Sequence, residues 1–282
     1  MNLYHMEDAS KSKSPHSAAH VNNEQAWDAR ARMQRRFARP VTDREFARRL
    51  SAIGTDPWLE GSLAGKRLLC LGSGGAMQSV LYAATGAVVT VVDISGEMLF
   101  LDRQAASERG LQVTTLQASI DDLSSLRDNL FDTVIQPVST CYVPEVASVY
   151  REVARVIVPG GLYISQHKQP VNLQATVKPG NLGYVLSEPY YRTGPLQAVS
   201  ASPHREEGVL EFLHRWEDLI GGLCRSGFVV EDLLEPLHAD AEATEGSFAH
   251  RCSYVPPYVR FKARRSGQRQ PSGRSVQIIR ND

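Results

Sequence analysis

Short apolar runs alternate with segments of helical periodicity through the middle of this chain. Runs of aliphatic and β-branched residues that stop at polar or glycine positions are typical of strands. Five such runs occupy residues 68–71, 88–92, 113–117, 131–135 and 162–166. Patterns with helical spacing lie between them, at residues 76–85, 96–109 and 145–158. This alternation indicates βαβ units and a parallel sheet that is covered on both faces.

The pattern changes after the fifth predicted strand, because residues 167–208 are rich in proline and glycine. So long a segment without regular structure is unusual in a compact domain unless it has a function, which predicts a lid insertion. A helix over 210–226, a strand from Phe228 and a last strand over 258–263 are expected to follow. We therefore expect one core domain over residues 65–265.

Both ends of the chain are polar. Residues 1–22 predict a disordered leader, and residues 266–282 predict a disordered tail. Residues 23–64 predict a helical cap that is broken at Pro40. Arginines gather in this cap, at Arg30, Arg32, Arg35, Arg36, Arg39, Arg44, Arg48 and Arg49. They form either a solvated helical face, which is the favoured interpretation, or a basic cover over an anionic substrate, and nothing in the sequence decides between the two.

The overall charge is balanced, with 31 Lys and Arg residues against 31 Asp and Glu residues. Proteins that bind nucleic acid usually carry a basic surplus, so we expect no nucleic-acid partner. The four cysteines lie far apart and show no metal-ligand spacing, so we expect no metal site. No apolar run has the length of a membrane span or the pattern of a signal peptide, which favours a cytoplasmic protein without a membrane partner.

Polar and glycine residues follow the first two predicted strands. Gly72, Ser73 and Gly74 let the backbone turn sharply and approach a ligand closely. Asp93 ends the second strand, nineteen residues beyond Gly74, where a carboxylate can accept both hydroxyls of a ribose. Ligands of open parallel sheets bind beyond the carboxyl ends of the strands, so these residues predict a nucleoside site.

An NAD-type dinucleotide site is the competing interpretation. Its fingerprint needs a third glycine three residues beyond the second, so that the helix can pack on the strand. With Gly72 and Gly74 as the first two glycines, that position holds Met77. The bulky side chain disfavours a nicotinamide-dependent oxidoreductase.

Four segments together resemble a known family: Leu68–Gly75, Val91–Ser95, Phe131–Val134 and Val156–Gly161. They are similar to class I S-adenosylmethionine-dependent methyltransferases, and more narrowly to the small-molecule subgroup called methyltransferase type 11. The resemblance implies a Rossmann-like three-layer α/β sandwich with a mostly parallel seven-stranded sheet and an antiparallel last strand. It also implies S-adenosylmethionine as cofactor and a small-molecule acceptor. A non-catalytic S-adenosylmethionine-binding protein on the same fold stays an alternative.

The resemblance also assigns cofactor contacts. The loop of Gly72, Ser73 and Gly74 would hold the methionine part, and Asp93 would hold the ribose. The remaining contacts would be Ile94 and Met98 near the adenosine, Ser119 and Ile120 beside the adenine, and Gln136 near the sulfonium. The family usually has an acidic residue where Cys70 stands and a glycine where Ala76 stands. An acidic residue is also common at position 119, and Asp121 is the expected substitute.

The residues that would contact the acceptor are predicted less directly. His167, just after the fifth strand, is our first candidate for a general base, followed by His204 and His214, although each histidine could instead satisfy local hydrogen bonds. The remaining candidates for an acceptor pocket are Ser139, Thr140, Tyr142, Tyr190, Tyr191 and Arg192. The segment from Gln136 to Ser139 lacks the second proline and the aromatic residue of the Asn-Pro-Pro-Tyr signature, which disfavours an exocyclic amine as acceptor.

Overall fold

A computed structural model describes residues 15–39, 41–199, 202 and 204–267. Its centre is one seven-stranded sheet with the order β3-β2-β1-β4-β5-β7-β6. The strands are β1 (Arg67–Leu71), β2 (Val88–Asp93), β3 (Val113–Gln117), β4 (Phe131–Gln136), β5 (Ile157–Lys168), β6 (Phe228–Leu234) and β7 (Tyr258–Arg265). β7 pairs antiparallel with both β5 and β6, and the pairs from β3 to β5 are parallel. The predicted sheet is confirmed.

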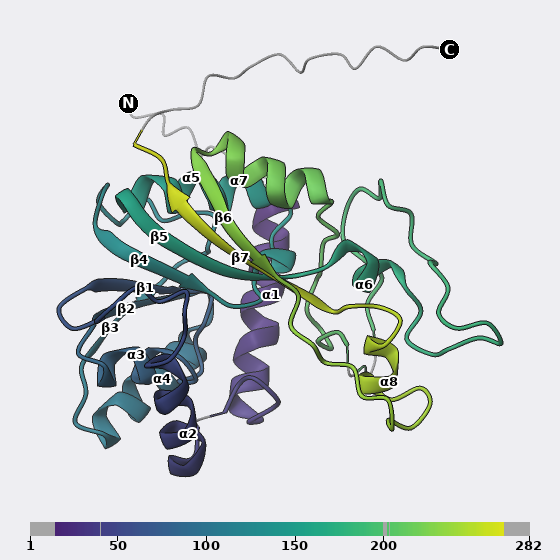
Figure 1. Cartoon of the computed structure of the whole chain (residues 1–282), viewed down its shortest axis with the longest axis horizontal. Helices are drawn as coiled ribbons and strands as arrows, with labels where there is room; N and C mark the ends of the chain where they lie inside the picture. Colours follow the sequence, from purple (N-terminus) through teal and green to yellow (C-terminus); the bar gives the residue numbers. More distant parts are fainter. Residues whose placement is uncertain (1–14, 40, 200–201, 203, 268–282) are drawn as a thin grey trace, which may run out of the picture.

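Helices cover both faces of the sheet (Figure 1). Along β1, Leu69 and Leu71 pack with α5 (Val146–Val156) and α7 (Gly222–Arg225), whereas Leu68 and Cys70 pack on the opposite face. That second face is covered by α3 (Ser79–Ala84) and α4 (Gly96–Glu108). Alternate side chains of a strand point to opposite faces, so a fully apolar strand such as β1 requires a helix layer on each side. The three-layer sandwich is confirmed.

The expected helix over 210–226 is wrong in its first part. Regular helix begins only with η2, a π-helical turn over Glu217–Gly221 that leads into α7. The preceding residues have no regular secondary structure because their backbone groups bond to distant segments: Phe212 N–H donates to the Cys141 carbonyl (2.7 Å), and the Glu211 carbonyl accepts from Leu196 N–H (2.7 Å). Tertiary hydrogen bonds therefore override the helical pattern there.

The N-terminal part also departs from expectation. α1 spans Pro15–Arg32, so residues 15–22, expected in a disordered leader, are helical. The physical reason is tertiary contact, because α1 bonds to the segments that follow β3 and β4. α2 (Asp43–Ile53) begins with a capping box between Thr42 and Glu45. Pro40, residues 1–14 and residues 268–282 lie outside the described parts of the chain.

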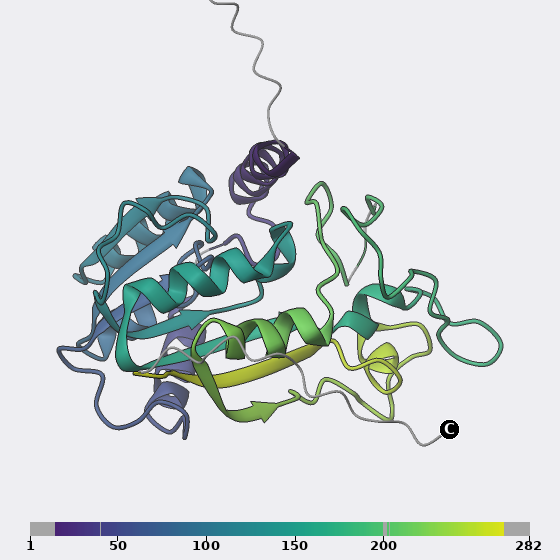
Figure 2. The same cartoon turned by 90° about the horizontal axis from the view of Figure 1, so that it is seen from above.

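α1 crosses the carboxyl edge of the sheet, where the parallel strands end (Figures 1 and 2). Asn23, which is 2% exposed, fastens it there. Its amide donates to the carbonyls of Tyr142 (2.9 Å) and Leu210 (3.1 Å), and its oxygen accepts from Leu210 N–H (2.7 Å). Near the end of α1, Asp28 accepts from the Ser95 hydroxyl (2.5 Å) and from Glu97 N–H (3.2 Å) at the start of α4.

The segment after β5 lies beyond the same edge, together with the segment between β6 and β7 (Figure 1). It contains the short helix α6 (Pro170–Gln174) and the isolated bridge between Ala175 and Leu186. The segment before β7 contains the short helix α8 (Phe248–Cys252). The buried Arg251 joins the two segments, because its guanidinium donates to the carbonyls of Asn172, Ala175 and Thr176. None of the described helices is long and apolar enough to cross a lipid bilayer.

The anchoring of α1 gives a prediction about stability. We expect Asn23→Ala to lower the free energy of unfolding by about 2–3 kcal/mol, because it leaves buried backbone groups of Tyr142 and Leu210 without partners. Urea titration followed by circular dichroism measures this change. Asn22→Ala is the matched control, since that neighbouring side chain is less buried, and it should cost less than about 1 kcal/mol. Equal losses in the two variants would contradict the anchoring role.

Candidate functional site

The loop after β1 accepts only glycine at two of its positions. Gly72 has φ +58°, and a Cβ there would lie 2.7 Å from the Ser139 hydroxyl oxygen and 3.0 Å from the Ile120 side chain. A Cβ on Gly74 would lie 2.7 Å from Cβ of Met98 and 3.0 Å from the Asp93 carboxylate. Neighbouring side chains thus approach the bare backbone of this loop closely.

Asp93 faces this loop from the end of β2. One carboxylate oxygen accepts from Gly74 N–H (2.9 Å), and the other accepts from Ser95 N–H (3.0 Å). The side chain is buried, and this burial raises the pKa of Asp93, while the backbone N–H groups oppose the rise. Gly74 and Asp93, which lie nineteen residues apart in the sequence and were predicted to form one site, are therefore in direct contact.

A second buried carboxylate, Asp102 on α4, supports the next turn of the loop, and the sequence analysis missed it. It accepts from Gly75 N–H (2.9 Å) and from the Ser79 hydroxyl. Burial raises the pKa of Asp102 to about 7, and burial, with a further contribution from the Asp102 charge, raises the pKa of the Cys70 thiol. Asp102 thus supplies a carboxylate next to Cys70, the position where the family usually has an acid. The available signal was an acidic residue on the apolar face of the predicted helix.

Ala76 occupies a left-handed backbone conformation, with φ +63°. Non-glycine residues adopt this conformation rarely, at a cost of roughly 1–2 kcal/mol. This conformation explains why glycine is usual at this position in the family. In this chain the methyl group packs in a buried cluster with Val41, Val80 and Ala105, which offsets part of that cost.

A cavity of about 350 Å³ opens beside the ends of β2 and β3. Its lining comes from the ends of these strands and from α1: His20, Val21, Glu24, Ile94, Gln117, Ala118 and Ser119. Ile94 and Ser119 are expected at the adenosine, whereas the sequence did not predict the contribution of α1, since residues 1–22 have the composition of a disordered leader. His20 bonds to Asp121 (3.2 Å), and this hydrogen bond raises the pKa of the imidazole, against desolvation.

Three other expected cofactor residues lie around the loop and outside the lining of this cavity. Ile120 contacts Gly72, and Met98 packs between the loop and α1. Gln136 is 1% exposed, donates to the Ser139 hydroxyl (2.9 Å) and accepts from the Tyr163 hydroxyl. Gln136 therefore connects to the loop through Ser139, and its expected place near the sulfonium stays a prediction. Ser73 stays in the loop as expected, with a buried hydroxyl that has no partner in the described residues.

His167, the first candidate for a general base, lies in the core of this structure, and that position disfavours the role. Its side chain is 1% exposed and packs on Phe261, with ring centroids 5.1 Å apart. One ring nitrogen lies 2.8 Å from the Thr140 hydroxyl, and the other lies 2.8 Å from the Ser165 hydroxyl. Burial lowers the pKa of His167 to about 3. A general base must reach the proton that it removes, and this imidazole is enclosed in the core.

The other acceptor candidates separate into two groups. His214 and Tyr190 have structural roles, because His214 bonds to the carbonyls of Thr140 (2.9 Å) and Val143 (3.1 Å), and the Tyr190 hydroxyl accepts from Trp216 N–H (3.2 Å). Tyr142 is half-buried and His204 is buried, and both lie in a group of charged side chains.

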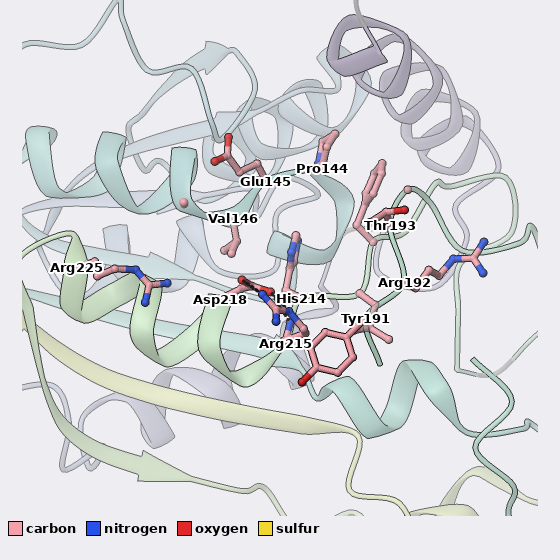
Figure 3. Close-up of a pocket in the computed structure, with 14 residues that line it drawn as sticks. Pro144, Glu145, Val146, Tyr191, Arg192, Thr193, His214, Arg215, Asp218 and Arg225 are labelled. Carbon is pink, nitrogen blue, oxygen red and sulfur yellow. Dashed lines mark hydrogen bonds and ion pairs between the residues drawn. The ribbon is translucent and has the colours of Figure 1, made fainter. Parts of the chain in front are cut away.

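A larger cavity of about 660 Å³ lies elsewhere (Figure 3). One side is formed by the N-terminal ends of α5 and of the helix over 217–225, and the other by the segment that carries Tyr191. Arg192 and Arg215 contribute to its lining, but both are paired with acids, Glu188 and Asp218. The two cavities share no lining residue. Among the described residues, no group of three or more His, Cys, Asp or Glu side chains could hold a metal ion.

Known proteins show the same arrangement. A family model described as "Methyltransferase domain", of type 11, matches residues 69–165. The uncharacterized methyltransferase YbaJ of Bacillus subtilis is 36% identical over 177 residues, which cover 61% of this chain and 69% of the relative. Ubiquinone biosynthesis O-methyltransferase of Xanthomonas euvesicatoria is 36% identical over 104 residues, which cover 36% of this chain and 44% of that relative. A solved S-adenosylmethionine-dependent methyltransferase from Mesorhizobium loti superposes with a TM-score of 0.60 at 24% identity, and the match covers 78% of this chain and 98% of that one.

The enclosed position of His167 predicts a pH effect on stability. The pKa in the folded state, about 3, lies below the ordinary value of 6.5, so the unfolded chain takes up a proton that the folded chain excludes. Stability from this group is present above pH 6.5 and is lost as the pH falls toward 3. In the wild type, this group should lower the free energy of unfolding by about 2 kcal/mol between pH 6.5 and 4.5. We expect this decrease to be absent in His167→Gln.

Urea titrations at these two pH values measure the change. Thr140→Val is the control, because it removes a hydrogen-bond partner of His167 but leaves the titrating imidazole. It should lower the free energy of unfolding at both pH values and keep the wild-type difference between them. If the free energy of unfolding of His167→Gln changed with pH as much as that of the wild type, the enclosed position of the imidazole would be contradicted.

Proposed function

This chain belongs to the class I S-adenosylmethionine-dependent methyltransferase family, and on that premise we propose that it methylates a small-molecule acceptor at the carboxyl edge of its sheet. The observation that carries the proposal is the contact between Gly74 and Asp93 (2.9 Å). It combines a bare backbone loop and a buried carboxylate at one place, next to a cavity lined by Ile94 and Ser119.

The residues present fit the cofactor. Gly72, Ser73 and Gly74 would hold its methionine end, and the unpartnered Ser73 hydroxyl supports this assignment because it offers both a donor and an acceptor there. Asp93 would accept the ribose hydroxyls with lone pairs that its two backbone bonds leave over. Ile94 and Ser119 would border the adenine in the cavity of about 350 Å³.

S-adenosylmethionine supplies an activated methyl group when it is bound. The protein must then align the acceptor with that group and exclude water, and such positioning alone can provide much of the rate acceleration. α1 suits this task, because it covers the carboxyl edge from His20 at the cavity to Asp28 at the start of α4. We infer that α1 and the lid over residues 167–208 together close the acceptor site.

We also propose a cytoplasmic location. Cys70, Cys141, Cys224 and Cys252 are all free thiols, which supports a reducing compartment.

The role of Asp93 is testable by binding. We expect Asp93→Ala to weaken S-adenosylmethionine binding at least tenfold, about 1.4 kcal/mol or more, because it removes the acceptor for the ribose hydroxyls and loosens the Gly74 turn. Isothermal titration calorimetry measures the affinity.

Asp132→Ala is the matched control, since Asp132 pairs with Arg67 at the start of β1, toward the amino edge of the sheet. That variant should bind like the wild type. Unchanged affinity in Asp93→Ala would remove Asp93 from the site, and tight binding of NAD(P) in place of S-adenosylmethionine would contradict the proposed cofactor.

A further inference from the structure

A group of charged side chains lies beside the carboxyl edge, outside the cofactor residues. Lys168 ends β5 and is 4% exposed. Its ammonium donates to Glu206 (2.8 Å), to Glu211 and to the His204 carbonyl (3.2 Å). Arg205 donates to the second carboxylate oxygen of Glu211. We call the following residues the Lys168 cluster: Arg30, Arg36, Lys168, His204, Arg205, Glu206, Glu211 and Arg251.

Several buried polar atoms of the Lys168 cluster have no partner in the described part of the chain. His204 is 4% exposed and stacks on Phe248, with ring centroids 5.2 Å apart, yet neither of its ring nitrogens has a hydrogen-bond partner. Nη2 of Arg205 and Nε of Arg30 are also buried and unpartnered. Buried polar groups in proteins are nearly always hydrogen-bonded, so this concentration indicates a ligand site.

Positive charge exceeds negative charge in the cluster. Arg251 is 1% exposed and donates to Asn172 and to backbone carbonyls, without a carboxylate among the partners found for it in the described residues. Burial and the charges of Arg251, Lys168 and Arg36 lower the pKa of His204 to about 4, so its imidazole is neutral at pH 7. The cluster contains five cations and two carboxylates, which leaves three positive charges without a counter-charge within it.

The Lys168 cluster and the glycine loop border the same edge. Arg36 is followed by Phe37, whose carbonyl oxygen lies 3.1 Å from the position of a Cβ on Gly75. The guanidinium of Arg36 lies over the ring of Phe248, 5.9 Å from its centroid, and His204 stacks on the same ring. The segment after β5 and α8 indeed lie beyond the ends of the parallel strands (Figure 2). An acceptor in the cluster would therefore sit beside the cofactor loop.

We propose that the Lys168 cluster binds the methyl acceptor and that the acceptor is a small organic acid whose carboxylate is held by Arg30, Arg205 and His204. The inference rests on the proposed function. A carboxylate supplies the missing negative charge, and its two oxygens can accept several donors at once. Guanidinium groups suit carboxylates in particular, and a neutral imidazole can donate one further N–H. For Arg30, this favours the basic cover over an anionic substrate and not a solvated face.

Matched acids and amides test the proposal on the full-length protein. The probes are benzoate with benzamide, cinnamate with cinnamamide, and hexanoate with hexanamide, each titrated by calorimetry in the presence of saturating S-adenosylhomocysteine. We expect the acid of at least one pair to bind ten times more tightly than its amide. No preference for the acid in any pair, or tighter binding of phenyl phosphate than of every acid, would overturn the proposal.

Variants then locate the binding site. His204→Phe keeps the aromatic ring on Phe248 but removes both ring nitrogens, and Arg205→Gln removes the guanidinium. Each should lower the affinity for the preferred acid at least tenfold while leaving that for S-adenosylhomocysteine within twofold of the wild type. Arg151→Gln is the control, since its side chain on α5 is 61% exposed, and it should change neither affinity. Wild-type affinity for the acid in both cluster variants would overturn the assignment.

Failure of this inference differs from failure of the proposed function. A chain that binds S-adenosylhomocysteine but shows no preference for acids would overturn the acid site alone. A chain that binds neither S-adenosylmethionine nor S-adenosylhomocysteine would overturn the proposed function as well. The comparison of acids with amides uses only the wild-type protein. It therefore tests the acid site even if a cluster variant fails to fold.

Discussion

The hydrogen bond from Gly74 N–H to the Asp93 carboxylate is the contact on which the functional site depends. It joins the ends of β1 and β2, and it forms only because Gly74 has no Cβ to hold the carboxylate away. The second oxygen of Asp93 accepts from Ser95 N–H, so the same side chain fixes the start of α4. α1 contacts this point too, through Asp28 and Ser95. A buried carboxylate loses its hydration, and these backbone donors replace it.

The sequence predicted the sheet well because its central strands are apolar and end at glycine or polar residues. β1, buried on both faces, and Asp93 at the end of β2 could be recognised from residue type and spacing alone. The errors arise where distant contacts decide the conformation. Residues 210–215 are not helical because their backbone groups bond to Cys141, Leu196 and Asn23, and none of these partners is close in sequence.

The site was predictable in its glycine loop and less so around it. His167 stands at the carboxyl end of a strand, where catalytic residues are common, but the direction of its side chain into the core is set by Thr140 and Ser165. Asp102 was missed for the opposite reason, since it is remote in sequence and meets the loop only when α4 packs on it. The Lys168 cluster could not be foreseen, because its members come from four separate segments of the chain.

These features describe a methyltransferase in which a common cofactor scaffold carries a particular acceptor site. The scaffold consists of β1, β2 and their loops, and the acceptor side consists of α1 and the segments beyond β5 (Figures 1 and 2). Because α1 contacts both parts, we propose that it is the physical link between cofactor and acceptor. The larger cavity of about 660 Å³ shares no lining residue with the small one, so size alone would have pointed away from the cofactor site.

A crystal structure of the full-length protein with S-adenosylhomocysteine tests the central claim most directly. The account predicts that the ribose hydroxyls lie within hydrogen-bond distance of Asp93 and that the amino-acid end lies against Gly72 and Gly74. It also predicts the adenine between Ile94 and Ser119. A ligand bound in the larger cavity beside Tyr191, with Asp93 bonded only to its own backbone neighbours, would contradict it.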